Sequence, residues 1–285
     1  MAHSDPKTLV STDWLAEHLD DSDLRIFDAS WFLPTVARDA KAEYAAAHIP
    51  GARFFDIDEI ADLRSPLPHM LPPDEKFLSR MRALGVGDGH RVVVYDSLGI
   101  FSAPRVWWTF RAFGKTDIAV LDGGLPKWTA EGRPVTAAAP TIRDRHMTIS
   151  RQRDMVKDVT EVAAAAKLGD WEIIDARAAD RFRGEAPEPR PGLRMGHIPG
   201  SKNLPWTDLL NDNQTMKSPA EIKALFEAAG VDLSKPAICS CGSGVNAAIL
   251  SLALTLIGHP RTAVYDGAWA EWGMYNDLTV ATGEA

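Results

Sequence analysis

Cysteine is scarce in this chain, because Cys239 and Cys241 are the only two cysteines among 285 residues. Two cysteines that lie two positions apart cannot form a disulfide framework, so a hydrophobic core must stabilise the fold. Basic residues are also in deficit: 31 Lys and Arg face 39 Asp and Glu, which gives a formal net charge of −8. This balance argues against nucleic acid as a partner but leaves room for a local basic pocket that binds a small anion.

Long apolar runs are missing as well. No stretch of the sequence approaches the roughly 20 apolar residues of a membrane span, and the residues from Met1 to Pro6 are polar, unlike a secretory signal. We therefore expect no membrane partner and a cytoplasmic location, where a thiol stays reduced. No His and Cys cluster with metal-ligand spacing and no dinucleotide-binding glycine motif is visible, so we expect no metal and no cofactor.

The most distinctive stretch that the chain does contain surrounds Cys241. A short apolar segment, Ala237-Ile238, precedes it, and an apolar run from Ala248 to Ile257 follows it. This pattern predicts a strand, a tight loop and a buried helix. Gly242 and Gly244 allow the loop to fold around the sulfur, and its N–H groups and the helix dipole would favour a thiolate. Cys241 is therefore a candidate nucleophile, although a lone cysteine could instead be a buried core residue.

The chain also repeats itself. Four segments of the first half recur in the second half in the same order, at offsets of 147, 149, 145 and 144 residues. The pairs are Leu24–Ala29 with Trp171–Ala176, His48–Ala52 with His197–Ser201, Val92–Asp96 with Ala237–Cys241, and Ala119–Trp128 with Ala263–Trp272. The sequence therefore predicts two copies of one α/β unit of roughly 130 residues.

Alternating strands and helices predict that each copy is a mostly parallel sheet with helices on both faces. We expect a first domain at residues 1–136, a linker at 137–157 and a second domain at 158–285. The place of Cys241 is taken by Asp96 in the first copy. A carboxylate is no sulfur nucleophile and would repel an anion. We therefore expect the first copy to be catalytically silent and to form one wall of a ligand cleft.

Taken together, these motifs resemble the two-domain rhodanese-type sulfurtransferases. The resemblance rests on Ala47–Asp56, on its counterpart Gly196–Gly200, on Tyr265–Trp272 and on the Cys241 loop, which together span nearly the whole chain. It implies two tandem rhodanese domains with the active site in the cleft between them. Because His48 and His197 occupy the same turn in both copies and only one copy has the nucleophile, we expect both to serve the fold.

The loop resembles the branch of this family that uses 3-mercaptopyruvate. Thiosulfate-specific members typically carry Arg and Lys after the nucleophile, whereas this chain has Gly242 and Ser243. The resemblance implies that Cys241 takes sulfur from 3-mercaptopyruvate, releases pyruvate and passes the sulfur to thioredoxin, a small thiol or cyanide. Gly242, Gly244, Val245 and Asn246 would line the binding loop, and Asn246 stands where the branch usually has Thr.

The same resemblance assigns the remaining site residues. Arg181 and Arg190 match the substrate-binding arginines, and a guanidinium suits a carboxylate. Ser243, His69 and Asp58 match a proposed proton relay. The alternative is that His69 and Asp58 are ordinary loop residues and that Ser243 only shapes the turn.

Three other functions share parts of this pattern. A thiosulfate sulfurtransferase is the main alternative, and a non-enzymatic module of the same fold is the second. A phosphatase of the related fold needs Arg after Cys and five residues, where this chain has Ala247. Cys239 is expected in the core or, less simply, in a disulfide with an oxidised Cys241. Arg105 has no counterpart in the second copy, and its role stays open.

Overall fold

The computed structural model describes residues 8–284 and divides them into two compact units. The first unit contains residues 8–63, Leu71–Gln152 and Asn211–Met216. The second contains Arg64–Met70, Arg153–Leu210 and residues 217–284. Within the described range, the helices are too short or too polar for any of them to cross a membrane.

The first unit is built on a five-stranded parallel sheet with the strand order β1-β5-β4-β2-β3. Its strands are β1 (Leu9–Val10), β2 (Leu24–Asp28), β3 (Arg53–Phe54), β4 (Arg91–Tyr95) and β5 (Ile118–Leu121). Its helices are α1 (Thr12–His18), α2 (Ala40–Ala46), α3 (Asp74–Ala83), α4 (Ala103–Ala112) and α5 (Gly124–Ala130). Side chains of α1, α2 and α5 pack in one apolar cluster with Ile26 and Val93 of the sheet, while Phe27 packs against Phe110 of α4.

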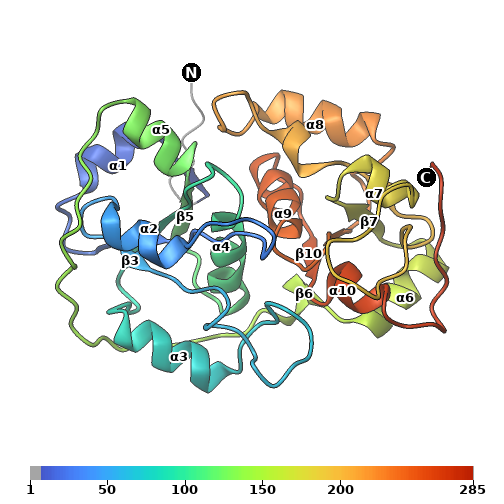
Figure 1. Ribbon diagram of the computed structural model, residues 1–285, viewed down its shortest axis with the longest axis horizontal. Helices are drawn as coiled ribbons and strands as arrows, with labels where there is room; N and C mark the ends of the chain where they lie inside the picture. Colours follow the sequence, from blue (N-terminus) through green and yellow to red (C-terminus); the bar gives the residue numbers. More distant parts are fainter. Residues whose placement is uncertain (1–7, 285) are drawn as a thin grey trace. The chain divides into compact units, whose positions relative to one another are not determined.

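The second unit repeats this arrangement in the strand order β6-β10-β9-β7-β8, again fully parallel. Its strands are β6 (Val156–Lys157), β7 (Glu172–Asp175), β8 (Lys202–Asn203), β9 (Ala237–Ser240) and β10 (Thr262–Tyr265). Its helices are α6 (Val159–Leu168), α7 (Ala179–Arg183), α8 (Pro219–Ala228), α9 (Ala247–Leu256) and α10 (Ala268–Trp272), with 3-10 turns η1 (Arg153–Met155) and η2 (Trp206–Leu209). The α/β class and the repeated unit predicted from the sequence are confirmed (Figure 1).

Local signals explain where many of these elements begin. The Ser11 hydroxyl accepts the Trp14 N–H at the start of α1, and Asp158 and Ser218 form capping boxes with Glu161 and Glu221 at the starts of α6 and α8. Such caps satisfy backbone N–H groups that have no partner within the helix. The two-residue strands β1 and β6 have no periodicity and were not predicted, and β6 lies inside the stretch expected to be a linker.

Two short segments group with the unit that does not contain their neighbours in sequence. Residues Arg64–Met70 leave the first half to join the second unit, and Asn211–Met216 leave the second half to join the first. We call these the exchanged segments. The two segments occupy similar places in the two copies, since offsets of 147–149 residues take Arg64–Met70 to residues 211–219. The repeat does not reveal the exchange, because it shows which segments correspond and not which unit each one packs in. The boundaries predicted at residues 136 and 158 stay a prediction.

Candidate active site around Cys241

Cys241 lies at the carboxyl end of β9, the central strand of the second sheet, and α9 begins six residues later. The carboxyl ends of parallel strands are the usual place for ligands in such folds. The side chain is 2% exposed, and the Gly244 N–H donates to Cys241 Sγ at 3.2 Å. Gly244 has a φ of 81°, a conformation that glycine adopts without strain. The predicted strand, tight loop and buried helix are confirmed.

Helix α10 fixes the outer side of this loop. The Trp269 N–H donates to the Cys241 carbonyl at 2.9 Å, and the Ala270 N–H donates to the Gly242 carbonyl at 2.9 Å. Because these carbonyls are satisfied by α10, the peptide groups are oriented, and a reactive sulfur is held without rearrangement of the backbone.

The equivalent loop of the first unit shows what such a loop binds. The N–H groups of Phe101, Ser102 and Ala103 donate to one Asp96 carboxylate oxygen at 2.8–2.9 Å, and Leu98 N–H donates to the other at 2.9 Å. The carboxylate of Asp96 therefore occupies the ring of N–H groups. Helix N-termini favour anions at such a place. At Cys241 the corresponding charge would be that of a thiolate or a sulfur bound to it.

Arg181 lies beside the loop. Gly242 carries no side chain, and a Cβ at that position would lie 3.0 Å from Arg181 Nη2. Arg181 ends in a partly exposed guanidinium on α7, and its Nε and Nη2 donate to the buried carboxylate of Glu188. The structure therefore brings Arg181 and Gly242 together at the nucleophile loop.

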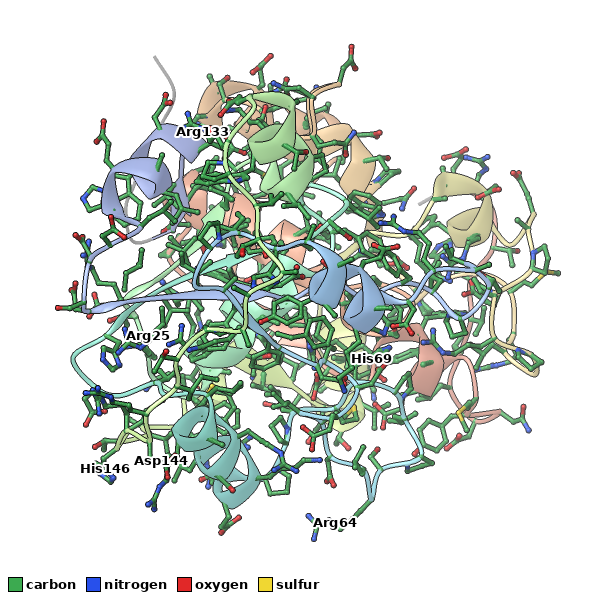
Figure 2. All side chains as sticks on the ribbon, turned by 60° about the vertical axis from the view of Figure 1, so that its left-hand side comes forward. Arg25, Arg64, His69, Arg133, Asp144 and His146 are labelled. Atoms are coloured by element: carbon green, nitrogen blue, oxygen red, sulfur yellow. The ribbon has the colours of Figure 1, made fainter. Side chains whose placement is uncertain are left out.

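Arg190 and His69 also meet within the second unit. Arg190 Nη2 lies 3.4 Å from His69 Nε2. His69, labelled in Figure 2, belongs to the exchanged segment Arg64–Met70. His69 is 8% exposed and has a φ of 61°, in the left-handed region that non-glycine residues rarely adopt. Strained backbone of this kind gathers at functional sites. A substrate role for both residues stays a prediction.

The other two relay residues, Ser243 and Asp58, belong to different units. Ser243 is 6% exposed, and within the described part of the chain its hydroxyl makes no side-chain hydrogen bond. Asp58 belongs to the first unit, where its Oδ2 accepts the Trp31 Nε1–H at 2.9 Å. It lines a cavity of about 410 Å³ together with Trp31, Lys41 and Asp56. The proton relay stays a prediction.

The last two residues of the binding loop are Val245 and Asn246. Val245 is buried. Asn246 occupies the N-cap position of α9 without capping the helix, and its Nδ2 is buried and has no hydrogen-bond partner among residues 8–284. A donor without a partner at this place is compatible with binding to a ligand, and the roles of both residues stay predictions.

Four residues outside the loop have structural surroundings. Cys239 is fully buried in β9, and burial together with the nearby Cys241 raises the pKa of its thiol, so Cys239 is protonated and no rival nucleophile. The Arg105 guanidinium is buried over the Trp108 ring at 4.5 Å. His48 and His197 each direct Nδ1 at a backbone carbonyl, those of Tyr44 and Phe182, and stack on these residues.

The sequence did not single out Arg177 and Glu188, whose side chains are buried. The Arg177 guanidinium bonds Asp175 and Glu188, and Glu188 in turn bonds Arg181. The repeat held a signal for Arg177: the copies read Asp28-Ala29-Ser30 and Asp175-Ala176-Arg177, so an arginine appears only in the copy that has the cysteine.

Comparison with known proteins gives a consistent result. A family model described as a rhodanese-like domain matches residues 11–131 and 158–275. A 3-mercaptopyruvate sulfurtransferase of Escherichia coli K12 is 45% identical over 272 residues, which cover 95% of this chain and 96% of that protein. A thiosulfate sulfurtransferase of Bos taurus is 42% identical over 273 residues, covering 93% and 92%. The crystal structure of SseA from Escherichia coli matches with a TM-score of 0.84 and 43% identity, covering 92% of this chain and 99% of that one.

Proposed function

Because the chain belongs to the rhodanese-like family, we propose that it is a sulfurtransferase that takes sulfur from 3-mercaptopyruvate onto Cys241 and releases pyruvate. The Cys241 thiolate attacks the donor sulfur, and the carbon–sulfur bond of the donor breaks. Its electron pair stays on carbon as the pyruvate enolate, which is then protonated, and the sulfur remains on Cys241 as a persulfide. Covalent catalysis divides one difficult transfer into two easier ones.

An acceptor thiolate then attacks the outer sulfur of the persulfide and regenerates the Cys241 thiolate. We propose a protein thiol of the thioredoxin kind, a small thiol or cyanide as the acceptor. The loop around Cys241 supports both steps, because its N–H groups can hold negative charge on sulfur, as the equivalent groups hold Asp96 in the first unit. The cytoplasmic location expected from the sequence stays a prediction.

The choice of donor rests on one observation, the Arg181 guanidinium beside Gly242. The loop itself carries no cationic side chain, so the positive charge that meets the donor comes from α7 and suits a carboxylate. Overall identity does not separate the donors, since relatives named for 3-mercaptopyruvate and for thiosulfate are 45% and 42% identical to this chain. Thiosulfate is therefore the second candidate donor.

Intact mass measurement tests the donor and the nucleophile together. After incubation with 3-mercaptopyruvate and removal of excess donor, we expect the protein to gain one sulfur atom, and the Cys241→Ser variant to gain none. Cys239→Ser is the matched control and should still gain the sulfur. A clear preference for thiosulfate in the same assay would reject the proposed donor, and sulfur uptake by Cys241→Ser would reject the nucleophile.

A further inference from the structure

One buried carboxylate holds two arginines beside the nucleophile loop. The Glu188 side chain is 2% exposed, its Oε1 accepts from Arg177 Nη1 at 2.7 Å, and its Oε2 accepts from Arg181 Nη2. Arg181 Nε also donates to Oε1 at 3.4 Å, so Oε1 is shared by the two guanidinium groups and Oε2 binds Arg181. An ionised glutamate is only a hydrogen-bond acceptor and has no proton to give. Any effect of Glu188 on the reaction must therefore act through the arginines that it binds.

Arg177, which binds Glu188, is itself held by the last residue of strand β7. The Arg177 Nε and Nη2 donate to the Asp175 carboxylate at 2.6–3.1 Å, at the end of β7, and Nη2 also donates to the Gly196 carbonyl at 2.8 Å. Burial works to lower the pKa of Arg177, but Asp175 and Glu188 outweigh it and raise that pKa, so the guanidinium stays charged. Its guanidinium also lies 4.3 Å from the centre of the Trp269 ring, and Trp269 binds the Cys241 carbonyl.

The silent copy supplies an internal comparison. Ser30 N–H donates to Asp28 at 2.9 Å, as Arg177 N–H donates to Asp175 at 2.9 Å, so both copies build the same turn. The first copy has no guanidinium there, and burial raises the pKa of Asp28. The turn therefore forms without the arginine. The chain of ion pairs from Asp175 through Arg177 and Glu188 to Arg181 occurs in the copy that has the cysteine.

We propose that Glu188 is a positioning residue that sets the Arg181 guanidinium for the carboxylate of the donor. This rests on the proposed function. Arg181 uses Nε and Nη2 for Glu188, and Nη1 has no hydrogen-bond partner within the described residues. With one side of the fork fixed, the remaining donors of a planar guanidinium keep a single orientation beside Gly242.

A charge effect and a positioning effect of Glu188 predict opposite changes in donor binding for Glu188→Gln. Removing a negative charge next to Arg181 should by itself strengthen the binding of an anionic donor. A glutamine, however, offers one oxygen and one NH₂ group, and the NH₂ group would face a guanidinium donor. If Glu188 positions Arg181, the variant must bind the donor more weakly although the site has become more positive.

Steady-state kinetics with 3-mercaptopyruvate separate these outcomes. We expect Glu188→Gln to raise KM for the donor about tenfold while kcat at saturating donor stays within about twofold, the pattern of lost binding. The matched control is Glu185→Gln, which removes an exposed glutamate paired with Arg183 on the same segment; its KM should not change. An unchanged or lower KM for Glu188→Gln would overturn the positioning role.

A binding measurement distinguishes weaker donor binding from a loss of catalysis. Titration of pyruvate into the Cys241→Ser protein measures binding without turnover. A second substitution in that protein, Glu188→Gln or Glu188→Asp, should weaken pyruvate binding. Arg181→Lys should weaken it as well, and combining it with Glu188→Gln should add little, because both changes affect one contact. Fully additive losses would overturn the proposal. Persulfide formation from thiosulfate but not from 3-mercaptopyruvate would reject the proposed function, and the donor-binding role with it.

Discussion

At the scale of single residues, Gly242 illustrates how a small residue can serve its neighbour. No left-handed conformation requires glycine there, but a Cβ would lie 3.0 Å from Arg181 Nη2, closer than ordinary contact. The sequence predicted Gly242 as a loop residue and Arg181 as a substrate residue, and the structure adds that the two lie side by side. That proximity could not be predicted, because Arg181 lies on α7 and Gly242 follows β9, far apart in the sequence.

Gly242→Ala should therefore damage donor binding more than stability. The methyl group would push aside the end of a flexible side chain, so we expect the free energy of unfolding to change by less than about 1 kcal/mol. The KM for 3-mercaptopyruvate should rise about fivefold as the guanidinium moves. Gly89→Ala is a suitable control, since a Cβ there meets no atom within 4 Å. Equal donor kinetics of the two variants would show that the space beside Gly242 is not needed.

At the scale of elements, the loop after each central strand was well predicted from the sequence, because glycines and the apolar run after Cys241 are local signals. The exchanged segments were not, since their partners are distant in sequence. Asn211–Met216 is held in the first unit by the Met216 N–H, which donates to Asp122 Oδ1 at 2.8 Å. Burial raises the pKa of Asp122 to about 6 in spite of this bond.

This pKa makes the attachment of the segment depend on pH. The unfolded carboxyl titrates near its ordinary value of 3.8, so between about pH 4 and pH 6 the folded protein binds a proton that the unfolded chain does not. The contribution of Asp122 to stability must therefore fall as pH rises through this window. Relative to the wild type, Asp122→Asn should gain about 2 kcal/mol in unfolding free energy between pH 4 and pH 7. Urea unfolding at both pH values measures it, and a difference that stays constant would contradict the assigned pKa.

At the scale of the whole molecule, the sequence predicted two copies of one α/β unit, and the family and the fold agree. The prediction succeeded because four segments repeat in register, which chance does not supply. The two compact units do not coincide with the two halves of the sequence, since each unit includes one exchanged segment from the other half. His69, which stands in the first half, is therefore part of the second unit together with Cys241 and Arg190.

The exchanged segments should couple the unfolding of the two units. Asp96→Ala removes the carboxylate that binds four N–H groups in the first unit, which should cost about 3 kcal/mol or more because buried donors lose their partner. Once the first unit unfolds, residues 63 and 71 no longer hold the ends of Arg64–Met70 together, and closing that loop onto the second unit becomes entropically less favourable. We therefore expect the urea concentration at which Cys241 becomes reactive toward a thiol reagent to fall in Asp96→Ala, although the substitution lies in the other unit. An unchanged midpoint for Cys241, with an earlier transition in tryptophan fluorescence, would show that the two units unfold independently.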